Sequence, residues 1–265
     1  MQNYKKRANN ARKKVLEMVH LGQTSHIGSN FSCIDILTVL FSKLNLDKDL
    51  KIDRDRFVLS KGWVASALYY FLAQKDIIPK EDLEEFGKDG SKYIGLAEPD
   101  VRGVEVAGGA MGHGLPIALG MALAAKRGNE SWKTYVLMSD GELDCGTTWE
   151  CALLAGHQKL NNLAVFVDYN GFQAMGTKKE VLNVEPLADK WHAFNWDVVE
   201  VDGHDYGEIS KAIDCLGKTG KPLMIIAKTT KGKGVSFFEG KLEWHYKTVD
   251  EDNYQKALIE LNAYE

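Results

Sequence analysis

Two oxygen-bearing side chains stand 30 positions apart in a stretch with the pattern of two buried strands joined by a helix. Asp140 follows the apolar run Thr134–Met138, and Asn170 comes shortly after the apolar run Leu163–Val167. Because the carboxyl ends of parallel strands meet at one edge of a sheet, we expect Asp140 and Asn170 to lie close together. Carboxylate and amide oxygens are hard ligands that suit Mg²⁺, which usually takes further oxygens from a phosphate.

Glycines beside these residues suit the approach of an anion. Gly141 would let the main chain come close to a diphosphate, and the start of the helix expected over Thr147–Lys159 favours negative charge. Taken singly, Asp-Gly and Asn-Gly pairs are more typical of turns and helix caps. The location of both pairs at strand ends of one strand–helix–strand unit favours a metal and diphosphate site.

The rest of the chain alternates between strand and helix patterns. Strands that are apolar throughout indicate a parallel sheet covered on both faces. We therefore predict an α/β fold, a parallel sheet with helices on both faces, in a single domain over residues 1–265. Further strands are expected at Arg56–Ser60, Asp197–Val201 and Leu223–Lys228, helices at Asn3–Leu21, Cys33–Lys43, Val64–Gln74, Leu115–Arg127 and Tyr206–Leu216, and a loop over 22–32.

Composition narrows the classes of partner. The formal net charge is −4, from 33 basic and 37 acidic residues, so the basic footprint of a nucleic-acid-binding protein is missing. No apolar run approaches the roughly 18 residues that a membrane span needs. Only four cysteines are present, in no standard zinc spacing, and there is no secretory signal, which together predict a cytoplasmic protein.

Several motifs in the right order resemble the transketolase family. Ser139-Asp140-Gly141 followed by Asn170 resembles the family's thiamine-diphosphate motif, which is Gly-Asp-Gly and a later Asn. The similarity continues across nearly the whole chain, through the segments SHIGSNFSCIDIL, DRDRFVLSKG, GVEVAGGAMGHGLPIALGMALAAK and KTTKGKGVSFFEGKLEWH. The resemblance implies the thiamine-diphosphate-binding fold and the first domain of such an enzyme.

The same resemblance implies roles for particular residues. Asp140, Asn170 and the main-chain carbonyl of Phe172 would hold Mg²⁺, or Ca²⁺ or Mn²⁺, against the diphosphate of the cofactor. His26 and His245 would be the catalytic residues and would face the reacting carbon or the diphosphate. A lone histidine is more often structural, but the motif context favours function here. The implied contacts to thiamine diphosphate are Trp63, Gly109, Ala110, Met111, Gly141, Glu142, Asn170 and His245.

The activity implied by the resemblance is transfer of a two-carbon ketol unit from a ketose to an aldehyde. The cofactor carries the hard chemistry and the protein orients it. In the family an activating glutamate belongs to a pyrimidine-binding domain, which would lie beyond the end of this chain. We therefore expect the N-terminal subunit of a split transketolase, active only with a partner chain that carries the pyrimidine-binding and C-terminal domains. Self-association of such pairs would give a heterotetramer.

Departures from the family pattern concern the donor. Trp63 and Leu96 stand where the family has histidines that contact donor hydroxyls, and Cys145 replaces an acidic residue. Ala174-Met175-Gly176 replaces Ile-Asp-Gly, and His26-Ile27-Gly28 replaces His-Pro-Gly. A site without these polar groups should recognise fewer hydroxyls. We expect an unusual donor, such as a deoxy, modified or nucleotide-linked sugar, or a 2-oxo acid.

Three other functions compete with this interpretation. A decarboxylating thiamine-diphosphate enzyme that transfers an acyl unit from pyruvate or a similar 2-oxo acid would share the metal motif. A non-catalytic assembly subunit is disfavoured by the intact Asp140 and Asn170. A dinucleotide-binding oxidoreductase would share the fold class, but no G-x-G-x-x-G follows a first strand.

Overall fold

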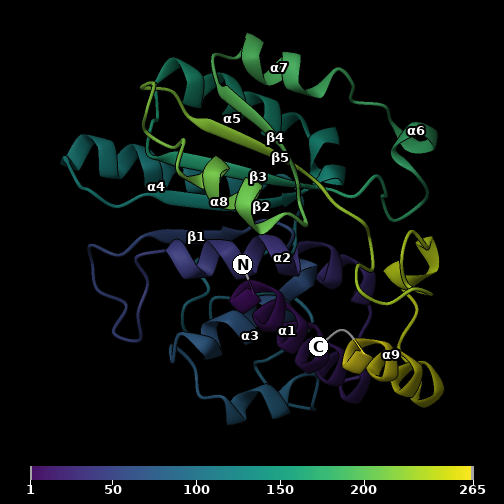
Figure 1. Cartoon of the computed structure of the whole chain (residues 1–265). Helices are drawn as coiled ribbons and strands as arrows, with labels where there is room; N and C mark the ends of the chain where they lie inside the picture. Colours follow the sequence, from purple (N-terminus) through teal and green to yellow (C-terminus); the bar gives the residue numbers. More distant parts are fainter. Residues whose placement is uncertain (1, 264–265) are drawn as a thin grey trace.

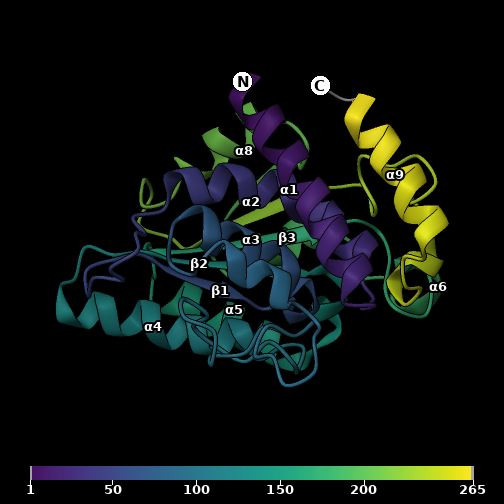
Figure 2. The ribbon, with the colours of Figure 1, turned by 90° about the horizontal axis from the view of Figure 1, so that it is seen from below.

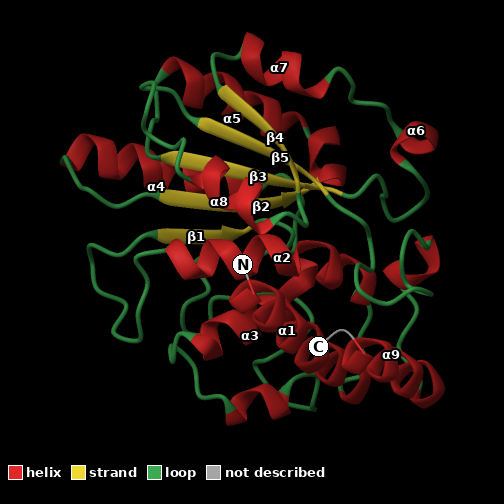
Figure 3. Cartoon of the chain, in the orientation of Figure 1, coloured by secondary structure: helices red, strands yellow, loops and turns green. Residues whose placement is uncertain are grey.

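A parallel sheet forms the centre of the molecule (Figures 1 and 3). The computed structural model describes residues 2–263, and within them five strands lie in the order β1-β2-β3-β5-β4, with every neighbouring pair parallel. This arrangement confirms the predicted fold class. The strands are β1 (Arg56–Leu59), β2 (Thr134–Ser139), β3 (Leu163–Tyr169), β4 (Asp197–Asp202) and β5 (Leu223–Lys228).

Helices cover both faces of this sheet (Figure 2). Successive side chains of a strand point to opposite faces, so Leu137 and Phe166 join one core while Val136 and Val165 join the other. The first core packs against α1 (Gln2–Leu21), α2 (Ile27–Lys43), α3 (Ala65–Gln74), α8 (Tyr206–Ile213) and α9 (Glu251–Ala263). The second packs against α4 (Gly114–Gly128), α5 (Gly146–His157) and α7 (Leu187–Ala193). Short helical turns complete the chain at η1 (Gly62–Val64), η2 (Glu81–Glu85), η3 (Asp140–Asp144), α6 (Lys178–Val181) and η4 (Leu242–His245).

Helix α2 corrects the expected loop over residues 22–32. The helix begins at Ile27 rather than Cys33, and all its residues as far as Phe41 are buried. Its polar first turns have tertiary partners: Asn30 Oδ1 accepts from Ser66 Oγ at 2.8 Å, and Ser32 Oγ donates to Asp168 at 2.6 Å. A helix buried all round needs a covering layer, and α1 and α3 supply it.

Helix α9 was not predicted. It begins after Asp250, whose side chain accepts from the main-chain N–H of Asn253 at 2.8 Å. Ala257 and Leu261 are buried on its inner face, and the helix packs against α1. No helix in residues 2–263 is long and apolar enough to cross a membrane.

A buried ion pair joins α1 to α2. The Arg12 guanidinium donates to both oxygens of Asp35, at 3.1 and 2.6 Å. His204 Nδ1 lies 2.8 Å from Asp35 Oδ2, and Tyr206 OH donates to Oδ1 at 3.0 Å. Burial works against the charge of Asp35, but Arg12 and His204 hold its pKa well below the ordinary range. We refer to Arg12, Asp35, His204 and Tyr206 as the Asp35 cluster.

Candidate active site

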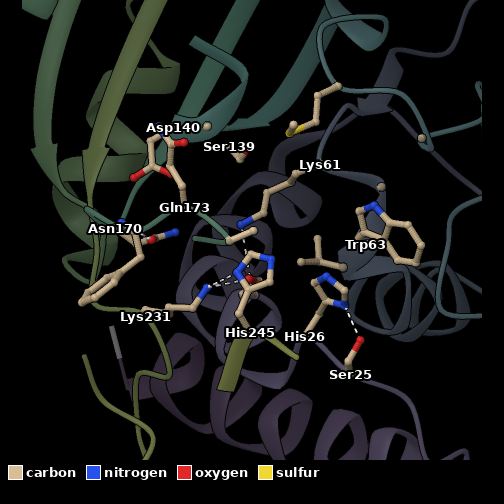
Figure 4. Close-up of a pocket in the computed structure, with 18 of the residues that line it drawn as sticks. Ser25, His26, Lys61, Trp63, Ser139, Asp140, Asn170, Gln173, Lys231 and His245 are labelled. Carbon is tan, nitrogen blue, oxygen red and sulfur yellow. Dashed lines mark hydrogen bonds between the residues drawn. The ribbon is translucent and has the colours of Figure 1, made fainter. Parts of the chain in front are cut away.

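The carboxyl ends of the strands surround a pocket of about 500 Å³. Lys61 lies just beyond β1, Asp140 directly follows β2, and Asn170 directly follows β3. Lys231 follows β5, which is hydrogen-bonded to β3. Because all these strands are parallel, the four side chains gather at one edge of the sheet, where a ligand of an open α/β fold is expected (Figure 4).

Asp140 and Asn170 lie next to each other at this edge. Asp140 is almost fully buried, and its Oδ2 accepts from the main-chain N–H of Gly171 at 2.8 Å. Asn170 Oδ1 accepts from the N–H of Phe172 at 3.1 Å. Burial, followed by the negative charge of Asp168, raises the pKa of Asp140 to about 7. A carboxylate whose charge is so costly is suited to a nearby cation.

The donor set fits Mg²⁺ in chemical type. The predicted ligands are one carboxylate, one amide oxygen and the carbonyl of Phe172, and all three residues line the pocket. Residues 2–263 contain no group of three or more His, Cys, Asp or Glu side chains that could hold a metal ion. Protein oxygens from Asp140, Asn170 and Phe172 would therefore need completion by a ligand's own oxygens, as is usual for Mg²⁺ bound with a phosphate.

Two buried lysines beside these oxygens differ in their partners. Lys61 Nζ donates to Asp168, a fully buried carboxylate that also accepts from Ser32 and Thr229. Lys231 is 1% exposed, and its Nζ contacts Ser29 Oγ at 2.9 Å and His245 Nδ1 at 3.1 Å. Within the described residues, Lys231 forms no ion pair. Burial and then the positive charge of Lys61 lower the pKa of Lys231 to about 8.

A buried ammonium without a carboxylate partner is costly and favours an anionic ligand. Neither lysine was predicted as a site residue. The signal was present, since Lys61 and Lys231 each follow an apolar strand in the same way as Asp140 and Asn170.

Four rings form the opposite wall of the pocket, and we call His26, Trp63, His245 and Tyr246 the aromatic wall. His26 stacks on Trp63, with ring centroids 5.1 Å apart and 15° between the planes. It also contacts His245 and Tyr246 edge-on, at centroid distances of 4.9 and 5.6 Å. Burial and then Lys231 lower the pKa of His26 to about 4 and that of His245 to about 3. Both imidazoles are therefore neutral at pH 7.

Close main-chain contacts bring Trp63 and Leu96, which were expected to replace family histidines, into one region. A Cβ on Gly62 would lie 2.3 Å from the carbonyl oxygen of Gly108, so this crossing requires glycine. Ala97 N–H donates to Gly62 O at 3.0 Å, directly linking the segment of Leu96 to that of Trp63. A Cβ on Gly109 would lie 3.3 Å from Leu96 Cδ2. Leu96 therefore packs behind the pocket wall at Gly109.

The structure gathers most of the predicted site residues around one pocket. Those that line it are His26, Trp63, Gly109, Met111, Asp140, Gly141, Asn170, Phe172 and His245. Ala110 lies between two lining residues without lining the pocket itself. The Glu142 carboxylate is turned away: it accepts from Ser60 Oγ and from the main-chain N–H groups of Gly112 and Ser139, the last two at 3.0 Å. Glu142 thus links the segments that follow β1 and precede α4 to the end of β2.

Comparison with known proteins gives the family. Residues 3–262 match the family described as "Transketolase, thiamine diphosphate binding domain". The chain belongs to the transketolase family. It is 40% identical over 255 residues to an apulose-4-phosphate transketolase subunit of Phocaeicola vulgatus, covering 95% of this chain and 91% of that protein.

Other relatives include both split and full-length enzymes. The "6-deoxy-6-sulfo-D-fructose transketolase subunit SqwG" of a Clostridium species is 38% identical, with 96% of this chain and 94% of that protein covered. The crystal structure of transketolase from Campylobacter jejuni superposes with a TM-score of 0.91 at 34% identity. It matches 99% of this chain but only 43% of that one. This transketolase-family chain therefore spans about two fifths of the full-length enzyme and nearly all of the named subunits.

Proposed function

We propose that this chain is the cofactor-binding subunit of a two-chain transketolase that moves a two-carbon ketol unit from a modified ketose to an aldehyde. The observation that carries the proposal is the pairing of an unneutralised ammonium, Lys231, with the oxygens of Asp140 and Asn170 in one pocket. That combination suits a diphosphate bridged to a divalent cation. Membership of the transketolase family supports thiamine diphosphate as the bearer of that diphosphate.

The proposed binding mode uses the two sides of the pocket differently. Asp140, Asn170 and the carbonyl of Phe172 would hold Mg²⁺, for which Ca²⁺ or Mn²⁺ could substitute. Lys231 and the main chain at Gly141 would face the diphosphate. Thiamine diphosphate, when bound, supplies the carbon nucleophile and the electron sink needed to break a carbon–carbon bond beside a carbonyl group. The rings of the cofactor would lie along Gly109, Ala110 and Met111.

The aromatic wall would contact the sugar. His26 and His245 are neutral, so each can offer a hydrogen bond to an oxygen of the donor without the cost of placing another positive charge beside Lys231. Trp63 offers a single N–H and no acceptor. A donor that lacks, or has modified, some of the usual hydroxyls fits this wall best. The names of two relatives, which act on apulose 4-phosphate and a 6-deoxy-6-sulfo-fructose, support such a donor.

Exposed apolar side chains at the pocket support a partner chain. Trp63 is 47% exposed, Met111 57%, Met175 82% and Tyr246 62%, and all four line the pocket. Exposed apolar side chains grouped at a binding pocket are typical of an interface. We propose that a chain with the pyrimidine-binding and C-terminal domains covers this opening, and the names of the relatives, which describe them as transketolase subunits, support such a partner.

Self-association would complete the assembly. Ile117 on α4 and Leu153 and Leu154 on α5 are exposed on two adjacent helices. Contact between copies through these helices would give a heterotetramer.

The four cysteines, Cys33, Cys145, Cys151 and Cys215, are all free, which supports a reducing compartment such as the cytoplasm.

Reconstitution tests the proposal. The chain would be co-purified with the partner subunit, supplied with thiamine diphosphate and Mg²⁺, and assayed with a panel of ketose phosphates, deoxy and sulfonated ketoses, and pyruvate. We expect ketol transfer from a modified ketose by the pair and none by either chain alone. Turnover of pyruvate with release of CO₂ would instead support the decarboxylating alternative. Activity of the single chain would refute the need for a partner.

A further inference from the structure

We infer that the two histidines divide the work of the site: Lys231 holds His245 as a fixed N–H donor, whereas Ser25 leaves His26 free to exchange a proton at its outer ring nitrogen. The inference rests on the proposed function only for the identity of the oxygens that the two rings contact. The states of the rings themselves follow from their neighbours in this chain (Figure 4).

Lys231 determines the tautomer of His245. Nζ of Lys231 lies 3.1 Å from His245 Nδ1, and an ammonium group has three donors and no acceptor. His245 Nδ1 must therefore accept this hydrogen bond. A neutral imidazole that accepts at Nδ1 carries its proton on Nε2. The second contact of Lys231, to Ser29 Oγ at 2.9 Å, keeps the ammonium in place.

The charges around Lys231 keep both partners in these states at neutral pH. Lys61 beyond β1 opposes the charge of Lys231, while Asp168 on β3 and Asp140 at η3 favour it. With its pKa lowered to about 8 by burial and Lys61, Lys231 is still mainly an ammonium at pH 7. His245, with its pKa lowered to about 3 by burial and Lys231, is neutral. The hydrogen bond therefore has a single direction.

His26 has a partner of a different kind. Its Nδ1 lies 2.6 Å from Ser25 Oγ, and a hydroxyl can either donate or accept. Either neutral tautomer of His26 is consequently satisfied by rotation of one O–H bond. To accept a proton from a substrate hydroxyl at Nε2, the neutral ring must carry its own proton on Nδ1, and Nδ1–H donates to Ser25 Oγ before and after the transfer. When Nε2 returns that proton, the ring is again the neutral tautomer that Ser25 holds as an acceptor.

Stacking fixes the plane of the His26 ring while leaving its protons free to move. Trp63 covers one face, and His245 and Tyr246 approach edge-on. The main-chain N–H of His26 donates to His245 O at 3.0 Å, which holds the two histidines at a constant separation. The pair thus combines one permanent donor, suited to a developing negative charge on oxygen, with one group suited to proton transfer. Toward these two rings, Lys231 and Ser25 act as positioning residues.

Nitrogen NMR of the full chain reads both tautomers directly. In a sample labelled with ¹⁵N-histidine at pH 7, we expect His245 to show a protonated Nε2 and an unprotonated Nδ1. Lys231→Arg, which keeps a group that only donates, should preserve this pattern. Lys231→Met should give averaged ring shifts for His245 and raise its pKa toward the ordinary value, because the main nearby positive charge is gone. Lys228→Met, at an exposed lysine paired with Glu200, is the matched control and should change neither ring.

Ser25→Ala should act on the other ring only. We expect changed ring shifts for His26 and an unchanged tautomer for His245. With the reconstituted pair saturated with thiamine diphosphate and Mg²⁺, Lys231→Met should lower kcat by up to about 100-fold, the cost of complete loss of one oriented donor to an oxyanion, and Lys231→Arg should recover most of the loss. Ser25→Ala should shift the acid limb of the kcat/KM profile, which a purely structural residue would not do.

Clear outcomes would overturn the inference. Two results would contradict the proposal that Lys231 fixes the tautomer of His245. One is a proton on His245 Nδ1 in the wild type, and the other is unchanged His245 shifts in a folded Lys231→Met variant. Should Lys231→Met fail to fold, the wild-type and Lys231→Arg spectra still decide. The NMR result needs no catalysis, so a chain with the expected tautomers but no ketol transfer would refute the proposed function and leave this inference standing.

Discussion

Two clusters of buried charge in this chain contain similar side chains but differ in how their charges are paired. In the Asp35 cluster, one carboxylate receives both arms of Arg12, the ring of His204 and the hydroxyl of Tyr206. At the pocket, Lys61 is neutralised by the buried Asp168 behind the lining, whereas Lys231 has two neutral partners. Asp140 accepts one main-chain hydrogen bond, to a single oxygen, from within the described residues.

This difference separates structure from function. A cluster whose charges are already paired gains nothing from a ligand, and its loss should lower stability. A cluster with an unpaired cation and an underused carboxylate is costly in the isolated chain and becomes satisfied when a diphosphate and a metal ion bind. Mutations in the Asp35 cluster are therefore expected to lower stability, and mutations in the pocket are expected to lower ligand binding.

The largest effect is expected on stability, from Asp35→Ala. This change leaves Arg12 buried without its carboxylate, which typically costs about 3–5 kcal/mol of unfolding free energy. Chemical unfolding of the chain measures it. Asp214→Ala, which breaks an exposed ion pair with Lys43, is the control and should cost less than about 1 kcal/mol. A loss of equal size in the two variants would show that the Asp35 cluster is not a structural anchor.

Asp140→Ala should act on binding instead. Removal of the only predicted charged metal ligand should weaken Mg²⁺-dependent binding of thiamine diphosphate to the reconstituted pair by more than about 100-fold, since even indirect ligand supports contribute 10- to 100-fold. Asn170→Ala should weaken it less. Titration calorimetry measures both, with Glu150→Ala on the exposed side of α5 as the control. Wild-type affinity in Asp140→Ala would refute the metal assignment.

Trp63→His tests the aromatic wall of the pocket, and its expected effect on activity is smaller. Each lost hydrogen bond to a donor hydroxyl costs on the order of 0.5–1.5 kcal/mol, and more when charged. We therefore expect the wild-type pair to use xylulose 5-phosphate very roughly ten- to a few-hundredfold less well than a typical enzyme uses its substrate. Trp63→His should recover part of this difference in kcat/KM, provided that Leu96 and Tyr246 leave room. A wild-type kcat/KM for xylulose 5-phosphate above about 10⁴ M⁻¹s⁻¹ would show that Trp63 does not change the donor specificity of the site.

The clusters also show what could be predicted from the sequence. The parallel sheet and the proximity of Asp140 to Asn170 followed from apolar runs and from the rule that parallel strands end at one edge, whereas the order of the strands did not. Helix α2 began early because Asn30 and Ser32, polar residues typical of a loop, find buried partners far along the chain in Ser66 and Asp168. Such partners cannot be identified from local pattern.

The same reason explains which site residues were missed. The role of Lys231 depends on its forming no ion pair within residues 2–263, where its Nζ contacts Ser29 and His245 instead, and that is a property of the packed structure. Glu142 was expected to contact the cofactor, yet its carboxylate accepts hydrogen bonds from Ser60, Gly112 and Ser139. Trp63 was identified from the family pattern, but its stacking on His26 required the left-handed backbone of His26, with φ of 71°, that turns this ring into the pocket wall.

The smallest effect should be the pH dependence of stability, and it again separates the two clusters. His26 and His245 have folded pKa values of about 4 and about 3, both lowered from 6.5 first by burial and then by Lys231. As the pH falls below 6.5, the unfolded chain binds protons at these residues and the folded chain does not, so stability is lost from pH 6.5 downward. Asp35 has a folded pKa below its ordinary 3.8, so its contribution is lost only when the pH falls below that value.

Melting temperatures between pH 7 and pH 4.5 therefore report on the pocket histidines and not on the Asp35 carboxyl. The raised pKa of Asp140 has the opposite sign and partly offsets the histidines, because the folded chain takes up that proton first. Comparison with a His26→Gln, His245→Gln double variant removes this common contribution. We expect the double variant to lose less stability than the wild type over this range, since glutamine binds no proton in either state. Parallel curves for the two proteins would mean that the imidazoles are protonated as easily in the folded chain as in the unfolded one. The rings of the aromatic wall would then be much more accessible to solvent than their packing indicates.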